Sequence, residues 1–157
     1  ANARLSCLDL PPVAIPNSLC FSPDGLRMYF SDGVSPCIQC CDYEPLSGRI
    51  ENIRVFAEVP LGHPDGSTVD SEGCVWNAEW GNGRVVRYRP DGSIERILPV
   101  PVSKPSCVAF GGTDLDTLYV TTARIGLHSE SDEDQAGSLF RIRLEDVRGL
   151  PEARWGL

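Results

Sequence analysis

The sequence lacks any long apolar run. No stretch approaches the ~18 consecutive apolar residues that a membrane-spanning helix needs. The first residues, ANARLSCLDLPP, lack the charged and then apolar segments of a secretory signal, and position 1 is not Met. We therefore expect no membrane association and a cytoplasmic location, and we interpret the chain as a fragment of a longer protein.

Basic residues are also scarce. Lys and Arg number 14 against 22 Asp and Glu, which gives a formal net charge of −8. A protein of this charge repels a phosphate backbone unless it carries a local basic cluster, and the sequence has none. The composition therefore argues against nucleic acid as a partner.

Cysteine is present, but not in a disulfide pattern. The seven cysteines are an odd number at irregular spacing, as expected for reduced thiols in a cytoplasm. Cys37, Cys40 and Cys41 form a C-x-x-C-C cluster compatible with zinc, yet no second cysteine pair completes four ligands. On a strand, Cys37 and Cys40 would point to opposite faces. We therefore favour buried thiols over a structural zinc site.

Turn-forming residues are abundant, with Gly 15 and Pro 13 in 157 residues, which favours many short strands over helices. Three stretches repeat one hairpin pattern: IPNSLCFSPDGLRMYFSD (15–32), HPDGSTVDSEGCVWNAEW (63–80) and KPSCVAFGGTDLDTLYVTTA (104–123). Asn17 and Asp65 are 48 residues apart, and Asp65 and Ser106 are 41 apart. This spacing is the period of a four-stranded propeller blade.

The repeats predict an all-β fold, with three antiparallel four-stranded blades of a β-propeller over 17–59, 63–102 and 105–157 and almost no helix. A β-sandwich is the alternative, but it has no reason to repeat the same turn chemistry. Three blades cannot close a ring, and they leave two apolar blade faces in water. We therefore expect either missing blades or a second copy of the chain to cover these faces.

Each repeat places a proline just before its innermost strand, so equivalent positions surround one opening of the central channel. The prolines are Pro16, Pro64 and Pro105, and the residues that follow them are Asn17, Asp65 and Ser106. The amide oxygen of Asn17 and the carboxylate of Asp65 are hard donors suited to Ca²⁺, Mg²⁺, Mn²⁺ or Zn²⁺. Pro-Asn and Pro-Asp also form turns, so both interpretations stay open.

The other polar residues are assigned simpler roles. We expect Asp24, Asp32 and Asp91 in turns, Asp70 and Glu72 in a turn and on the surface, and His63 and His128 without a ligand role. The acidic residues Glu130, Asp132, Glu133 and Asp134 are expected in a solvated loop. Trp76 and Trp80 are expected to pack between blades, with one of them alternatively lining a pocket mouth.

These repeats, together with GSLFRIRLEDVRGLPEARW, resemble in order the second half of the sugar lactonase family that includes regucalcin, gluconolactonases and arabinolactonases. The resemblance begins near Ile15 and covers nearly all of the chain. It implies that 1–157 is the C-terminal half of one six-bladed propeller lactonase domain whose N-terminal half is missing. Phe21 and Ser18 depart from the family pattern, in which many members carry Trp and Gly.

The resemblance also implies a site and a reaction. The family's metal-binding asparagine matches Asn17, and its metal-binding and catalytic aspartate matches Asp65. One divalent ion would polarise a lactone carbonyl while Asp65 acts as general base. The family's third ligand, a glutamate, and its arginine and asparagine substrate contacts lie outside this chain, so we expect the isolated chain to be inactive.

Two other functions fit the same pattern. One is a propeller module that binds or scaffolds another protein without chemistry, which would agree with the missing glutamate and arginine. The other is an arylesterase or strictosidine-synthase-like propeller, a related architecture with other substrates. Binding of one divalent ion through Asn17 and Asp65 would separate a lactonase from a scaffold.

Overall fold

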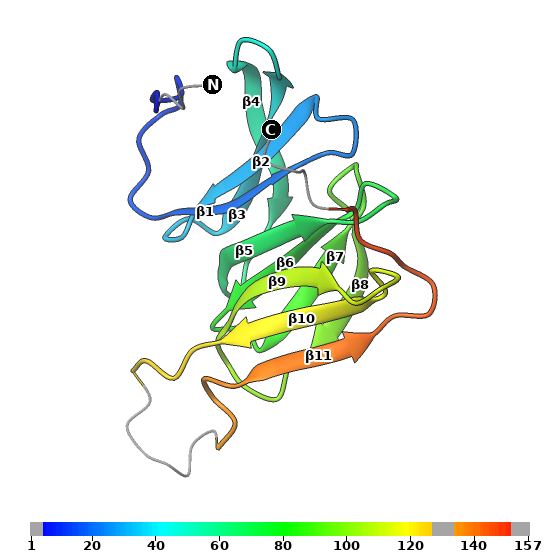
Figure 1. Ribbon diagram of the computed structural model, residues 1–157. Helices are drawn as coiled ribbons and strands as arrows, with labels where there is room; N and C mark the ends of the chain where they lie inside the picture. The colour runs from blue at the N-terminus through cyan, green and yellow to red at the C-terminus, as the bar shows by residue number, and fades with distance from the viewer. Residues whose placement is uncertain (1–4, 127–133, 152–157) are drawn as a thin grey trace.

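The computed structural model describes residues 5–126 and 134–151. Within these residues the regular secondary structure consists of β-strands, without a helix (Figure 1). The strands are β1 (Pro16–Phe21), β2 (Arg27–Asp32), β3 (Cys37–Glu44), β4 (Arg49–Glu58), β5 (His63–Val69), β6 (Val75–Trp80), β7 (Arg84–Tyr88), β8 (Ile94–Pro99), β9 (Pro105–Gly111), β10 (Thr117–Thr122) and β11 (Leu139–Arg143). The all-β prediction is confirmed. Among the described residues, no helix is available to cross a membrane. His128, Glu130, Asp132 and Glu133 lie outside the described residues.

The strands form three antiparallel sheets, which follow one another along the chain. Their orders are β1-β2-β3-β4, β5-β6-β7-β8 and β11-β10-β9. Within the described residues the third sheet therefore has three strands, whereas the sequence predicts four. After β11 the chain leaves the sheet, because the N–H of Ser71 donates to the carbonyl of Arg148 and Gly149 forms an isolated bridge with Asp70.

Asp-Gly turns end the hairpins as predicted. The carboxylate of Asp24 accepts hydrogen bonds from the Ser22 hydroxyl and the Leu26 N–H, and that of Asp91 accepts from the Ser93 N–H at 2.9 Å. Gly92 has φ of +86°, and a Cβ there would lie 1.9 Å from the carbonyl oxygen of Phe56. Glycine at this turn is therefore required both by the backbone and by the approach of β4.

Asp32 begins a turn as predicted, because its carboxylate accepts the N–H of Val34 and its carbonyl accepts the N–H of Ser35, and it has a second role as well. It ends β2, and its carboxylate accepts the N–H groups of Ala14 at 3.0 Å and Ile15 at 3.1 Å. These bonds fasten the segment before β1 to the end of β2. The start of β1 is thereby held in place.

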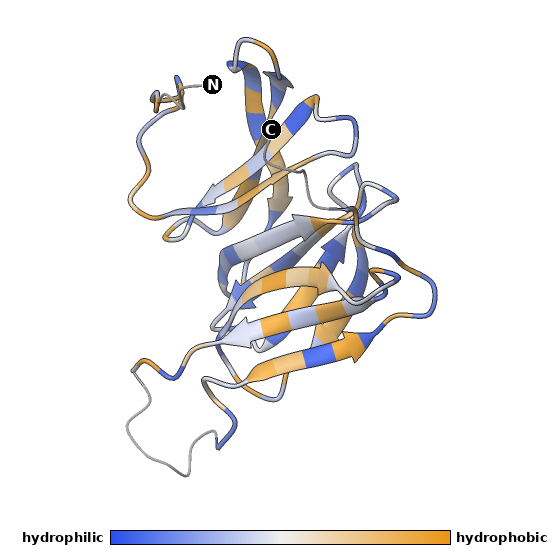
Figure 2. Ribbon diagram, viewed as in Figure 1, coloured by the Kyte–Doolittle hydropathy of each residue, from blue (hydrophilic) through white to orange (hydrophobic). Residues whose placement is uncertain are grey.

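The second sheet packs between the other two and is buried on both faces (Figure 2). Successive side chains of a strand point to opposite faces, so Val75 packs toward the first sheet and Trp76 toward the third. The first interface is formed mainly by Tyr29, Ile38, Phe56, Val75, Val86 and Tyr88, and the second by Trp76, Val85, Val108, Leu118 and Val120. Each such side chain contributes about 1.5–3 kcal/mol when it is fully buried.

The cysteine cluster is part of this packing. Cys40 lies in the interface between the first two sheets, while Cys41 packs with Met28 and Phe30 in a separate cluster, as strand alternation requires. Burial raises the pKa of both thiols. The described residues contain no group of three His, Cys, Asp or Glu side chains arranged to hold a metal. Cys40 and Cys41 are therefore buried thiols, whereas Cys37 is partly exposed, and all seven cysteines are free.

The surface assignment of Asp70 is wrong. Its side chain is fully buried, and it accepts hydrogen bonds from the Trp76 indole N–H and the Arg87 Nε, both at 2.8 Å. Arg87 also contacts Glu72 at 2.6 Å and Glu95 at 3.1 Å. Asp70 is buried at the edge of the Trp76 ring, where the indole N–H binds its carboxylate and Arg87 supplies the compensating charge.

Removal of Arg87 tests this buried charge network. In Arg87→Ala the Asp70 carboxylate stays buried without a cation, so we expect the free energy of unfolding to fall by about 3–5 kcal/mol in the whole protein. The matched control is Arg49→Ala, because Arg49 pairs with Glu51 through exposed side chains and its loss should cost only about 0–1 kcal/mol. Urea unfolding monitored by fluorescence measures both. Equal losses in the two variants would contradict the assignment.

Candidate functional site

The innermost strands of the three sheets, β1, β5 and β9, lie side by side (Figure 1). Asn17, near the start of β1, and Asp65, near the start of β5, line the same hollow. The hollow has a volume of about 470 Å³, and its other lining residues are Ile15, Gly33, His63, Pro64 and Trp80. The structure thus gives one amide and one carboxylate access to a common space.

A β-bulge lies at each of these residues: one directly follows Asn17, and the other includes Asp65. The register between β1 and β2 shifts between Asn17 and Cys20, and the register between β5 and β6 shifts between Pro64 and Ser67. Ser18, directly after Asn17, has φ of +59°. Because a bulge bends its strand and re-aims side chains, the same irregularity in two repeats gives Asn17 and Asp65 equivalent settings.

Gly66 brings β9 close to Asp65. A Cβ at Gly66 would lie 2.7 Å from the Cα of Cys107, so any larger residue would force β5 and β9 apart. Ser106, the third residue of the predicted ring, does not line the hollow. Its hydroxyl lies 2.9 Å from that of Thr121. The third repeat thus contributes close packing to this region rather than a donor in the hollow.

The carboxylate of Asp65 is half-buried and poorly compensated. Burial raises its pKa to about 6, while the N–H of Gly66 acts in the opposite direction. No Lys, Arg or His among the described residues forms an ion pair with it within 4.0 Å. A desolvated carboxylate in this setting is stabilised by a cation.

The sequence predicts no ligand role for His63 and favours packing between blades for Trp80, with a pocket mouth as the alternative for one tryptophan. These two residues are register partners at the open end of the β5–β6 hairpin, and both line the hollow. The ammonium group of Lys104 lies 5.6 Å from the centre of the Trp80 ring and donates to the carbonyl of Ile125 at 2.6 Å. Trp76, by contrast, is fully buried. The register of the hairpin pairs His63 with Trp80, so this register could have predicted that the two side chains lie at the same hollow.

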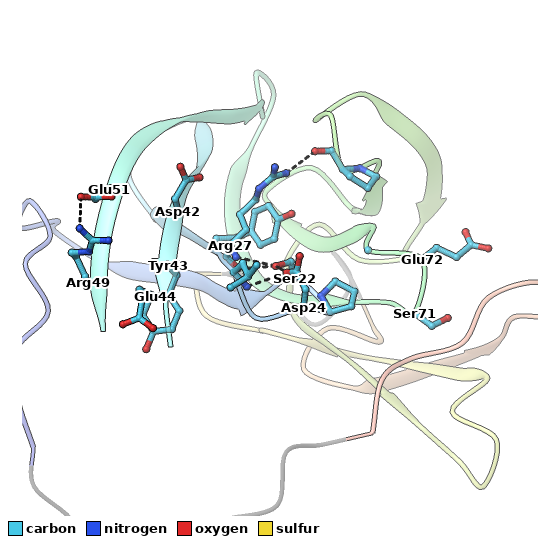
Figure 3. A pocket seen from close by; sticks show the side chains of 15 residues that line it. Ser22, Asp24, Arg27, Asp42, Tyr43, Glu44, Arg49, Glu51, Ser71 and Glu72 are labelled. Carbon is cyan, nitrogen blue, oxygen red and sulfur yellow. Dashed lines mark hydrogen bonds and ion pairs between the residues drawn. The ribbon is translucent and has the colours of Figure 1, made fainter. Parts of the chain in front are cut away.

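A second hollow, of about 690 Å³, lies beyond the opposite end of β1 (Figure 3). It is lined by the turn after β1, by parts of β3 and β4, and by the turn from Ser71 to Gly73. Its carboxylates already have partners: Asp24 with Ser22, Asp42 with Asn52 and Arg54, Glu44 with Ser47, Glu51 with Arg49, and Glu72 with Arg87. These acidic groups are therefore occupied within the protein, unlike Asp65.

Three comparisons place the chain among known proteins. It is 49% identical to an L-arabinolactonase of Azospirillum brasilense, over 99% of this chain and 52% of that protein. It is 41% identical to a pentonolactonase of Haloferax volcanii, over 90% of this chain and 51% of that protein. The crystal structure of a calcium-binding protein, regucalcin, from Agrobacterium tumefaciens matches with a TM-score of 0.85 and 37% identity, over 92% of this chain and 50% of that one.

The chain spans about half the length of the curated relatives it matches. The family model described as the SMP-30/Gluconolactonase/LRE-like region matches residues 6–124. This match covers most of the sequence and includes Asn17 and Asp65. The chain therefore belongs to the SMP-30/gluconolactonase/LRE-like family.

Proposed function

We propose that the protein carrying this chain is a metal-dependent hydrolase that opens sugar-acid lactones of the gluconolactone or arabinolactone class. The observation that carries the proposal is the pairing of Asn17 with a desolvated, uncompensated Asp65 in one hollow. The names of the two lactonase relatives support the substrate class. We further propose that the protein is cytoplasmic and that either further propeller blades or a second copy of the chain covers the outer blade faces.

The residues present fit a divalent metal ion. An amide oxygen and a carboxylate are the donors that Ca²⁺, Mg²⁺ and Mn²⁺ prefer, and Zn²⁺ also accepts them. Because Asp65 is desolvated, a cation would lower the pKa that burial raises. Asn17 and Asp65 are too few to complete a coordination shell, so solvent, substrate or the rest of the protein would supply the other ligands.

A bound divalent ion would polarise the carbonyl group of the lactone. Asp65 would act as general base by accepting a proton from the water that attacks the carbonyl carbon. When the bond between that carbon and the ring oxygen breaks, the protonated Asp65 would return the proton to the ring oxygen. The product is the open hydroxy acid, and the carboxylate is regenerated.

The hollow has walls suited to a small sugar lactone. Its volume lies within the range of about 300–1,000 Å³ that is usual for small-molecule sites. Ile15 and Trp80 offer apolar surface to the C–H groups of a ring, while Asn17 and Asp65 offer polar groups. The substrate contacts implied by the family resemblance lie outside this chain, so the isolated chain should not turn over a lactone.

Two other functions remain in competition with the lactonase. A propeller that only binds or scaffolds another protein needs no divalent ion at Asn17 and Asp65. An arylesterase-like propeller would hydrolyse aryl esters in preference to sugar lactones. Metal titration and a comparison of the two substrate types separate these possibilities.

Replacement of Asp65 tests its role as a base. In the whole protein, Asp65→Asn keeps an oxygen donor but cannot accept the proton, so we expect lactone turnover to fall by about 10²-fold or more while part of the metal binding survives. Turnover is followed by proton release with a pH indicator at saturating metal.

The matched control is Asp91→Asn, because Asp91 lies in an exposed turn between β7 and β8. This variant should hydrolyse the lactone at the wild-type rate. Full activity in Asp65→Asn, or wild-type turnover that does not respond to a chelator, would remove the proposed mechanism.

Replacement of Asn17 tests the metal site separately from the base. We expect Asn17→Ala to lose activity mainly through weaker metal binding, because the side chain supplies a ligand oxygen and no proton transfer. Excess metal ion should therefore restore part of the turnover. The measurement is the lactonase rate across a metal titration, with Asn52→Gly on the exposed strand β4 as control. A loss that no metal concentration reduces would contradict the ligand role.

A further inference from the structure

A buried polar seam joins the first two sheets directly behind the hollow. It consists of Ser18 on β1, Ser31 on β2 and Asn77 on β6, and their side chains are 2%, 0% and 0% exposed. Ser31 is the register partner of Asn17, and Asn77 is the register partner of Ser67 in the bulge next to Asp65. The seam thus runs between the backbone segments that carry Asn17 and Asp65.

Ser18 is the centre of the seam. Its hydroxyl donates to the main-chain carbonyl of Asp65 at 2.6 Å and accepts from the Ser31 hydroxyl at 3.0 Å and the Asn77 amide at 3.1 Å. A hydroxyl has one hydrogen to donate and two lone pairs, so every capacity of this group is used. The bond to Asp65 is a direct link between the two sheets.

Asn77 holds the same carbonyl from the other side. Its Nδ2 lies 3.1 Å from the carbonyl oxygen of Asp65, 3.1 Å from the Ser18 hydroxyl and 2.9 Å from the Ser67 hydroxyl. A carbonyl only accepts, so the amide must present its N–H group toward Asp65. Its Oδ1 is buried and has no hydrogen-bond partner in the part of the chain that the structure describes. An unpaired buried amide oxygen costs free energy that an apolar side chain of similar size would not, so packing alone does not account for Asn77.

The backbone of Ser18 points to the same conclusion. At φ of +59° this residue occupies the left-handed region, which is unfavourable for residues other than glycine, asparagine and aspartate. Glycine would adopt this conformation without strain, but it would leave the Asp65 carbonyl and the Asn77 amide without the hydroxyl. The serine is therefore explained by the seam rather than by the backbone.

We propose that Ser18, Ser31 and Asn77 are positioning residues, which set the separation of Asn17 and Asp65 and thereby the affinity for the divalent ion. The inference rests on the proposed metal site. Two ligands on different sheets bind one ion tightly only if the sheets are held at a fixed spacing. Bonds made to ligand-bearing segments typically change metal affinity by about 10–100-fold when they are removed.

The test uses Mn²⁺ alone, without lactone, titrated calorimetrically into the whole metal-free protein. Ser18→Gly, Asn77→Val and the double variant form a cycle. We expect each single variant to bind Mn²⁺ about 10–100-fold more weakly. The double variant should bind Mn²⁺ with nearly the same affinity as the single variant that binds it less tightly, because both changes break the same seam.

Melting temperature separates positioning from a general structural effect. Ser18→Gly removes the backbone strain, so it should weaken Mn²⁺ binding with little loss of melting temperature. The control is Val120→Ala, in the buried core between the second and third sheets, which should lower the melting temperature and leave Mn²⁺ affinity unchanged. If Asn77→Val does not fold, Ser31→Ala replaces it in the cycle, both alone and combined with Ser18→Gly.

Three outcomes overturn the inference. The first is wild-type Mn²⁺ affinity in Ser18→Gly, and the second is additive losses in the cycle. The third is weakening of Mn²⁺ binding by Val120→Ala to the same extent. Asp65→Ala distinguishes the two proposals: if it binds Mn²⁺ like the wild type, the metal site and the seam fail together. If Asp65→Ala loses Mn²⁺ while Ser18→Gly keeps it, the seam alone fails.

Discussion

The second sheet buries apolar side chains on both faces, and the rest of the described structure depends on this constraint. Because Val75 and Trp76 point to opposite sides, the sheet is stable only between two neighbours. Stacking in this order places β5 between β1 and β9. The meeting of Asn17 and Asp65 at one hollow is therefore a result of core packing rather than of any attraction between the two residues.

Two carboxylates on the β5 segment are treated in opposite ways. Asp70 has a cation, an indole N–H and the main-chain N–H groups of Glu72 and Cys74 around it, and its charge is fully compensated. Asp65 is half-buried, and among the described residues only the N–H of Gly66 acts against its desolvation. This difference supports the proposal that Asp65 is a metal ligand and general base.

Much of this structure could be predicted because the signals are local. Asp24 and Asp91 stand in turns that depend on a few neighbouring residues, and the repeat spacing alone places Asn17 and Asp65 at the starts of innermost strands. The roles of Asp70, Ser31 and Asn77 could not be predicted, because each depends on a partner from another strand or sheet. The third sheet also differs from expectation, since residues after β11 find hydrogen bonds at the β5–β6 turn. The proposed role of Asp65 as general base follows from the family resemblance, whereas its position indicates only a candidate metal ligand.

The left-handed serine at position 18 has a consequence for how this sequence can change over generations. A mutation of Ser18 to glycine relieves the backbone strain but removes the hydroxyl that accepts from the Asn77 amide. A mutation of Asn77 keeps the strain at Ser18 and removes one of the hydrogen bonds that offset it. The selective value of each residue therefore depends on the other. Positions 18 and 77 lie 59 residues apart in the chain, yet the residues at these two positions should change together during evolution.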